Sequence, residues 1–290
     1  MPENASSELA PSSGRDPKFA ICNELFRDWS YARACNFVAE LGYRGLEIAP
    51  FTILDSESVI SDRRTRELRQ ALEQAGLATV DLHWLLAQTS GLGLTDSRET
   101  VRRQTAEHLA KLAELCRELG GSIMVLGSPQ QRNLASHLTP ELGLEYAADC
   151  LERVLPVLEQ QRVTLAIEPL AASETNFLNT AAETMKLIDP FESPWIQLHL
   201  DVKAMSAEST PIPELIRRHR AALAHFHAND PNLQGPGMGA IDFVPILRAL
   251  QAIEYPGWIS VEVFDESPGP QALARQSIDN LQRDWAAARA

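Results

Sequence analysis

Eight short apolar runs of the sequence each end in, or lead directly into, a polar residue that could do chemistry. In chain order these residues are Glu24, Glu47, His83, Ser128, Glu168, Asp201, His227 and Glu262. The last four runs contribute three carboxylates and one imidazole. This set suits a hard or borderline divalent cation such as Mn²⁺ or Mg²⁺, and it leaves coordination positions open for substrate oxygens. We therefore predict a metal site formed by Glu168, Asp201, His227 and Glu262.

Each of these residues also has an ordinary structural explanation. A single acidic residue at the end of a strand often caps a helix or lies in a solvated loop. Four ionisable groups around one concave rim, however, would repel one another or stay unpaired without a cation, and burying uncompensated charge is expensive. The group as a whole therefore favours a metal site over four unrelated structural roles.

Three further residues lie next to the predicted ligands. His199 and His225 each precede a ligand by two residues, so strand periodicity points them to the same inward face, one layer deeper. We expect both to be hydrogen-bonded core histidines rather than ligands. Lys203, two residues beyond Asp201, is either a substrate-binding cation at the rim or a solvated loop lysine.

The apolar runs that carry these residues have the pattern of buried β-strands. They alternate with longer segments in which apolar residues recur at the spacing of an α-helix. The predicted strands span residues 18–24, 43–48, 78–83, 122–128, 163–168, 196–201, 222–227 and 258–263. Near-continuous apolar strands indicate a parallel sheet covered by helices. Eight βα units predict a closed (β/α)₈ TIM barrel forming a single domain, in which the carboxyl ends of all strands meet on one rim. An open dinucleotide-binding sheet is disfavoured because the first turn, NELFRDW, lacks the GxGxxG phosphate cradle.

Composition and charge disfavour several classes of protein. The chain has 290 residues, of which 44% are hydrophobic and 22% charged, as in a soluble globular protein with a sizeable core. The net charge of −13 opposes binding to nucleic acid or to an anionic membrane, and no apolar run reaches the roughly 20 residues that span a bilayer. The four cysteines lack CxxC spacing and are expected to be reduced core residues. We predict a cytoplasmic protein with a disordered N-terminal leader over residues 1–16 and a barrel domain over residues 17–290.

The order of several motifs along the eight units resembles one enzyme family. AIEPL in the fifth unit, LHLD in the sixth, HFHANDPNLQGPGMGAIDF in the seventh and GWISVEVF in the eighth look like the sugar phosphate isomerase/epimerase family, which has a xylose isomerase-like TIM barrel. HWLLAQTSGLGLT, GSPQQRN and ETNFLNT fit the same pattern after the third, fourth and fifth strands. The resemblance covers residues 18–285.

The resemblance implies a divalent-metal-dependent isomerase or epimerase of carbohydrate metabolism. It implies Mn²⁺ as the ion, with Mg²⁺, Co²⁺ or Zn²⁺ as substitutes, held by the four predicted ligands. Glu168 and Glu262 would act as the catalytic acid/base pair. One would remove a proton from the carbon next to the carbonyl of an α-hydroxy ketone or aldehyde, giving an enediolate, and the other would return it. The metal would polarise the substrate oxygens and stabilise the developing oxyanion.

The resemblance also implies an opposite wall of the pocket, which contacts a small carbohydrate. Glu47, His83 and Trp84 follow the second and third strands and are expected to bind the substrate, together with Ser128 and Lys203. An aromatic ring beside a histidine suits the apolar face of a sugar and one of its hydroxyls. Local capping and core packing are the structural alternatives for Glu47 and His83.

Two positions depart from the pattern of the free-ketose 3-epimerases in this family. Those enzymes usually carry a histidine three residues after the strand-six aspartate and an arginine six residues after the strand-seven histidine. This chain has Ala204 and Leu233 at these positions. Specificity for free ketoses is therefore in doubt, and Lys203 could replace one of the missing polar contacts.

Three other functions stay open on sequence alone. A keto-sugar or inosose dehydratase or lyase would share the proton abstraction and then expel a β-hydroxyl. A nuclease similar to endonuclease IV would need a histidine-rich site for three zinc ions, which the strand ends do not supply. A sugar-binding protein without catalysis would leave the acid/base pair idle. The sequence also leaves open which sugar is bound, whether it is phosphorylated and whether the chain forms a homo-oligomer.

Overall fold

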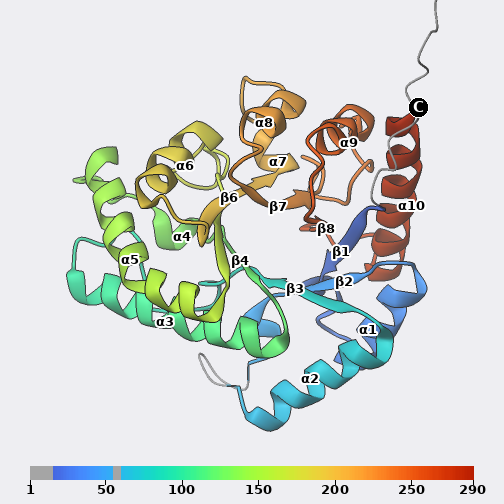
Figure 1. Ribbon diagram of the computed structural model, residues 1–290, viewed down its shortest axis with the longest axis horizontal. Coiled ribbons are helices and arrows are strands. Elements are labelled where there is room, and N and C mark those ends of the chain that lie inside the picture. The colour runs from blue at the N-terminus through green and yellow to red at the C-terminus, as the bar shows by residue number, and fades with distance from the viewer. Residues whose placement is uncertain (1–15, 55–59) are drawn as a thin grey trace, which may run out of the picture.

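The computed structural model describes residues 16–54 and 60–290 and shows a closed barrel of parallel strands. Within these residues the barrel has eight strands, which follow one another around the ring in sequence order: β1 (Lys18–Cys22), β2 (Gly45–Ile48), β3 (Ala78–Leu82), β4 (Ile123–Leu126), β5 (Thr164–Ile167), β6 (Ile196–Asp201), β7 (Leu223–Ala228) and β8 (Trp258–Val261). The ring closes where β8 pairs with β1, with Phe19 opposite Ile259. The predicted (β/α)₈ TIM barrel of a single domain is therefore confirmed (Figure 1).

Helices separate consecutive strands and surround the barrel (Figure 1). The longer ones in the described part of the chain are α1 (Tyr31–Glu40), α2 (Asp62–Ala75), α3 (Glu99–Leu119), α5 (Pro140–Gln161), α6 (Ala181–Ile188), α8 (Ile212–Arg218), α9 (Phe243–Ala252) and α10 (Pro270–Arg289). Shorter elements are the 3-10 helices η1 (Asn23–Phe26), η2 (Pro50–Thr52) and η3 (Asp189–Phe191) and the one-turn helices α4 (Pro129–Arg132) and α7 (Val202–Met205). All of these except η3 follow a strand closely, so they place side chains over the carboxyl end of the barrel.

Residue types at the helix ends explain where several helices begin and stop. The hydroxyl of Ser30 accepts a hydrogen bond from the backbone N–H of Arg33 at the start of α1, and Thr180 accepts one from Glu183 at the start of α6. Gly120 follows α3 with a φ of 93°, a left-handed conformation that costs glycine little. These local signals fix the length of the helices that return the chain to the next strand.

Several strands end earlier than the sequence predicts, and this places their polar residues just beyond the sheet. The sequence predicts a strand to residue 128, whereas β4 ends at Leu126. Ser128 has a φ of 41° and leads into α4, a conformation that a strand does not contain. β5 and β8 also stop one residue before Glu168 and Glu262, so these two carboxylates stand at the rim.

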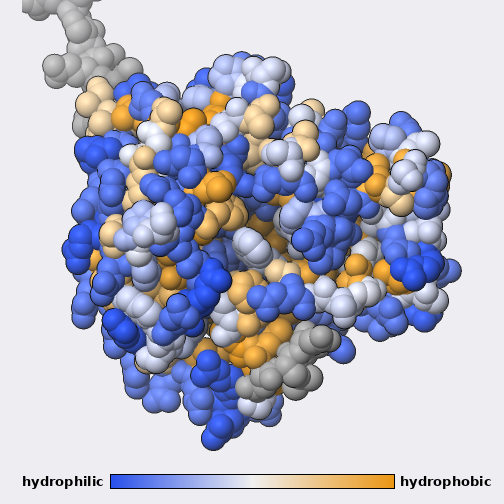
Figure 2. Space-filling model, turned by 180° about the vertical axis from the view of Figure 1, so that it is seen from behind, coloured by the Kyte–Doolittle hydropathy of each residue, from blue (hydrophilic) through white to orange (hydrophobic). Residues whose placement is uncertain are grey.

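Apolar side chains of the strands and of the inner helix faces form one core, which contains fully buried residues such as Leu46, Ile167 and Phe226. The four cysteines are buried and free, as predicted. On the side seen in Figure 2 the surface is largely hydrophilic, and apolar residues show mainly in the recesses between polar ones. No helix among the described residues is long and apolar enough to cross a membrane. Residues 1–15 of the predicted leader lie outside the described residues.

Candidate active site at the carboxyl ends of the strands

A cavity of about 430 Å³ opens at the carboxyl ends of the barrel strands. Most of the predicted site residues line it: His83, Trp84, Ser128, Glu168, Lys203, His227 and Glu262. Asp201 lies below the cavity wall and is fully buried. These residues come from six different strands or the loops after them, so the barrel brings together groups that lie far apart in the sequence.

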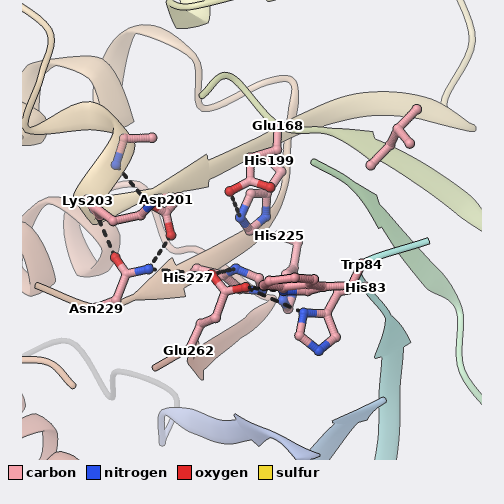
Figure 3. A network of polar contacts seen from close by, with 12 residues as sticks. His83, Trp84, Glu168, His199, Asp201, Lys203, His225, His227, Asn229 and Glu262 are labelled. Atoms are coloured by element: carbon pink, nitrogen blue, oxygen red, sulfur yellow. Dashed lines mark hydrogen bonds and ion pairs between the residues drawn. The ribbon is translucent and has the colours of Figure 1, made fainter. Parts of the chain in front are cut away.

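The four predicted metal ligands meet on one side of this cavity (Figure 3). Glu168, Asp201 and His227 each offer a ligand atom, and these atoms lie within 4.8 Å of one another. Glu262 joins them through His227, because its Oε2 atom lies 3.1 Å from the Nδ1 atom of that histidine. The side-chain amide of Asn229 donates to Asp201 Oδ2 at 2.5 Å and approaches Glu262 Oε2 at 3.5 Å.

Burial and crowding give the two glutamates opposite charge states. Burial, together with Asp201 and Glu262, raises the pKa of Glu168 to about 8. Burial alone would also raise the pKa of Glu262, but the adjacent His227 and His83 outweigh it and hold this pKa well below its usual range. The site therefore contains one carboxyl that keeps its proton readily and one that is ionised, which is the pattern of an acid/base pair.

The chemistry of this cluster fits a divalent cation. Burial and Glu262 raise the pKa of Asp201 to about 6, so the side chains nearby supply too little positive charge for the carboxylates. Both ring nitrogens of the fully buried His199 lack a hydrogen-bond partner among the described residues. Carboxylate oxygens together with imidazole nitrogens are donors that Mn²⁺, Co²⁺ and Zn²⁺ accept. Unsatisfied donors and excess negative charge at one place are what a bound cation would correct.

The two deeper histidines behave differently from each other. His225 approaches Glu47 and Asp81 through its Nε2 atom, each at 3.1 Å, in agreement with its prediction as a polar core residue. His199 was expected to be hydrogen-bonded in the same way, but its nearest acidic atom is Glu168 Oε1 at 4.0 Å. The expectation for His199 is therefore wrong, because the layer around it offers no acceptor or donor at hydrogen-bonding distance among the described residues. Burial and the neighbouring histidines lower its pKa, so its ring is neutral.

Glu47 lies deeper than the sequence suggested. It is fully buried and does not line the cavity, since its position in the middle of β2 is below the rim. Its Oε1 atom lies 2.8 Å from Nε2 of His227 and 3.1 Å from Nε2 of His225. The expected substrate contact is therefore corrected to a contact with the histidines beneath the site. Asp81, which sequence analysis did not single out, completes this buried group.

His83 and Trp84 both line the cavity and lie beside Glu262. His83 Nε2 lies 3.0 Å from Glu24 Oε2, and its Nδ1 atom lies 3.6 Å from Glu262 Oε1. The indole N–H of Trp84 donates to Glu262 Oε1 at 2.9 Å. Trp84 is 39% exposed and has a φ of 54°, an uncommon conformation for a bulky residue that turns its ring across the cavity mouth.

Ser128 and Lys203 line the cavity with restrained side chains. The Ser128 hydroxyl accepts a hydrogen bond from the backbone N–H of Leu86. The Lys203 ammonium donates to Glu174 Oε1 at 2.6 Å and lies 4.4 Å from the centre of the Phe264 ring. Its side chain is only 12% exposed, so Lys203 is not a solvated loop lysine.

Some residues of the site were missed by sequence reasoning. Asn229 follows His225 and His227 at the same two-residue spacing, so strand periodicity could have found it. Arg132 carries no such signal: its buried guanidinium donates to the backbone carbonyls of Glu168 at 2.6 Å and Leu126 at 2.5 Å. It therefore fixes the ends of two neighbouring strands from the short helix α4, a position that only the fold reveals.

The sequence of this chain is similar to a family of TIM barrels and to two sugar epimerases. A family model described as xylose isomerase-like TIM barrel matches residues 35–284. An L-ribulose 3-epimerase of Mesorhizobium japonicum is 27% identical over 224 residues, which cover 69% of this chain and 72% of that protein. A 3-dehydro-D-guloside 4-epimerase of Escherichia coli is 22% identical over 274 residues, or 90% of this chain and 97% of that protein.

Solved structures agree with this fold. The crystal structure of a 3-keto-D-glucoside 4-epimerase from Escherichia coli has a TM-score of 0.81 at 20% identity and covers 92% of this chain and 100% of that chain. A structure of L-ribulose 3-epimerase has a TM-score of 0.80 at 22% identity and covers 94% and 96%. The named relatives are sugar epimerases, and at these identities the structural likeness concerns the barrel.

Proposed function

Because this chain belongs to the xylose isomerase-like TIM barrel family, we propose that it is a divalent-metal-dependent sugar epimerase that inverts a carbon next to a carbonyl. One observation carries the proposal. Glu168 and Glu262 face one cavity beside a group of metal-ligating side chains, and their surroundings push their pKa values in opposite directions. Such a divergent pair suits removal of a proton by one group and its return by the other.

Glu168, Asp201, His227 and Glu262 would hold the cation, with Mn²⁺ as the preferred ion and Mg²⁺, Co²⁺ or Zn²⁺ as substitutes. When bound, the ion would polarise the carbonyl and hydroxyl oxygens of the substrate and stabilise negative charge on them. Asn229 would hold the Asp201 carboxylate in place through its short hydrogen bond. Glu47 would orient His227 by accepting a hydrogen bond from its Nε2–H group, as outer partners of metal-binding histidines commonly do.

The two glutamates would carry the proton transfers. Glu262, ionised and held by the Trp84 indole, would take the proton from the carbon next to the carbonyl, leaving an enediolate. Glu168 would return a proton to the same carbon from the other side, which inverts the configuration. The two residues follow β5 and β8, strands separated by β6 and β7, so they approach the substrate from different sides of the rim.

The charge of the cavity favours an unphosphorylated sugar. Two cationic residues other than histidine, Arg27 and Lys203, are among the described residues that line it. Arg27 is bound to Glu266, and Lys203 is bound to Glu174. A phosphate group would therefore meet no free cation there, and it would lie beside several carboxylates. This argues for a neutral keto-sugar, and the same negative charge disfavours DNA and therefore a nuclease.

The walls of the cavity favour a substrate that extends beyond one monosaccharide. Trp84 lies 6.2 Å from Phe51 and 6.3 Å from Phe264, measured between ring centres, so three aromatic rings lie close together at the mouth. Aromatic rings suit the apolar faces of sugar rings. Ala204 and Leu233 offer no polar group where free-ketose epimerases carry histidine and arginine. We therefore favour a keto-glycoside, with a free ketose as the alternative.

Exchange of carbon-bound hydrogen with solvent tests this function. The metal-loaded protein is incubated in deuterated water with a panel of ketoses, keto-glycosides and sugar phosphates. We expect deuterium to enter a neutral keto-sugar and an epimer to form. Loss of a hydroxyl with formation of an unsaturated product would instead identify a dehydratase. No exchange across the panel would favour a sugar-binding protein and contradict the proposal.

Substitution of the two glutamates assigns their roles. Glu168→Gln and Glu262→Gln keep side-chain size and one oxygen donor but remove the base. Each should keep substantial affinity for Mn²⁺ and lower turnover by roughly 10²-fold or more, the usual size of a general-base contribution. Glu159→Gln, at an exposed position of α5, is the matched control and should behave like the parent protein. Full activity of both active-site variants would refute their role as the acid/base pair.

A further inference from the structure

His199 lies in the site, but no hydrogen bond among the described residues holds its ring in place. It lies in β6 with its side chain fully buried, and neither Nδ1 nor Nε2 has a hydrogen-bond partner among the described residues. Leaving a buried polar group unsatisfied costs on the order of 1–3 kcal/mol, and here two atoms of one ring are involved. His225, in the equivalent position on β7, has its Nε2 atom against two carboxylates. A different partner must therefore account for His199.

The backbone directs His199 toward the predicted metal ligands. The pairing of β6 with β7 shifts register between Leu198 and His199, and such irregularities next to active sites redirect side chains. After the shift, His199 pairs with His225 and Asp201 pairs with His227. Figure 3 shows the His199 ring directly beside the Glu168 carboxylate. Its ring centre lies 4.2 Å from that of His227.

The spacing of these atoms is compatible with one shared ion. A ligand atom of His199 lies within 4.8 Å of ligand atoms of Glu168, Asp201 and His227. The Nε2 atom of His199 is 4.0 Å from Glu168 Oε1, too far for a hydrogen bond. Two atoms that each lie about 2.1 Å from the same metal ion can be up to about 4.2 Å apart, so this distance allows an ion between them.

We propose that His199 is a second imidazole ligand of the metal, and that the site therefore selects a borderline transition-metal ion over Mg²⁺. The inference rests on the proposed metal-dependent function. Imidazole nitrogens bind Co²⁺, Zn²⁺ and Mn²⁺ far better than Mg²⁺, which prefers oxygen ligands and keeps its waters. Magnesium sites are built from oxygen ligands. A site with two imidazoles should therefore bind Mg²⁺ less well than a site with the four predicted ligands, which include one imidazole.

Direct metal titration tests this without an activity assay. The metal-free full-length protein is titrated with Co²⁺ and with Mg²⁺, and the same is done for His199→Phe, which keeps a ring of similar size. We expect the parent to prefer Co²⁺. The substitution should lower Co²⁺ affinity by at least ~10–100-fold, the loss seen when only an outer partner of a ligand is removed. Mg²⁺ affinity should change much less.

Pulsed electron paramagnetic resonance of the Mn²⁺-loaded protein counts the imidazole nitrogens bound to the ion. Two are expected in the parent protein and one in His199→Phe. His199→Gln replaces His199→Phe if the latter does not fold, and circular dichroism checks both. His219→Gln, on the outside of the barrel after α8, is the control for the loss of a histidine and should leave both titrations unchanged.

The outcomes separate the inference from the proposed function. One imidazole in the parent, or equal Co²⁺ affinity in the parent and His199→Phe, overturns the role of His199. If Asp201→Asn still abolishes metal binding in that case, the metal site itself stands. A parent protein that binds neither ion overturns both the inference and the metal-dependent function.

Discussion

Replacing Gly127 with alanine should displace the Glu168 carboxylate without disturbing the barrel. Gly127 follows β4, and a Cβ atom added there would lie 2.3 Å from Glu168 Oε2. Ordinary contacts between carbon and oxygen begin near ~3.3 Å, so the carboxylate must move by about 1 Å. A displacement of about 1 Å in a catalytic group can cost 10²-fold in rate, which corresponds to about 2.7 kcal/mol. We therefore expect turnover to fall roughly 100-fold, together with weaker Mn²⁺ binding.

The fold should tolerate this change, because the group that must move is the end of a flexible side chain. Turnover, Mn²⁺ affinity by titration and thermal unfolding by circular dichroism are measured for Gly127→Ala. Gly93→Ala is the matched control, since its added Cβ would meet its nearest atom, the Cβ of Asp96, at 3.3 Å. Parent-like turnover and Mn²⁺ affinity in Gly127→Ala would refute the placement of Glu168 at the reacting centre.

Three further predictions address charge, substrate binding and stability. In the metal-free protein the pKa of Asp201 is raised to about 6 and the pKa of His227 is raised above its usual value, so a cation must displace the protons of these two ligands. Mn²⁺ affinity should then rise with pH from about pH 6 upward, and a flat profile in titrations would contradict this. Trp84→Ala should raise KM for the sugar about tenfold by removing an aromatic face worth up to ~1.5 kcal/mol, and an unchanged KM would show that the wall is wrongly assigned. Gly45→Ala would place a Cβ 2.5 Å from Val80 Cγ2 and should lower the free energy of unfolding by about 1–3 kcal/mol, measured by denaturant titration.

The architecture and the rim of the site could be predicted from sequence because barrel strands carry a strong signal. Strands buried on both faces appear as continuous apolar runs, and each run here leads into a polar residue. Once eight such runs are assigned to a barrel, their carboxyl ends must share one face. Glu168, His227 and Glu262 line the cavity for this reason, although they lie up to 94 positions apart in the sequence.

Depth and orientation inside the barrel could not be predicted in the same way. Glu47 and Glu168 both looked like strand-end carboxylates, yet Glu47 lies within β2 while Glu168 follows β5. Their heights along the barrel depend on the stagger between strands, which no single strand sequence encodes. His199 and His225 have the same spacing from a ligand, but the register shift beside His199 gives them different surroundings. The Arg132 contacts depend on where the short helix α4 lies after β4, which the sequence does not mark.

An alternating row of carboxylates and imidazoles runs from the cavity into the barrel interior. Its members, each within 3.6 Å of the next, are Glu24, His83, Glu262, His227, Glu47, His225 and Asp81. Protons shared between neighbours offset the buried charge of this row.

Glu168 and Asp201 lie outside that row. Among the described residues, no histidine nitrogen comes within hydrogen-bonding distance of either carboxylate, and burial raises both pKa values. His199, the imidazole without a hydrogen-bond partner, lies beside the same two carboxylates. Within the described part of the chain, two carboxylates without a hydrogen bond to any histidine, Glu168 and Asp201, therefore lie next to His199, a histidine without a hydrogen bond to any carboxylate. A proton cannot satisfy this arrangement as it does in the row, because Glu168 and His199 are 4.0 Å apart, whereas a divalent cation between them would serve both.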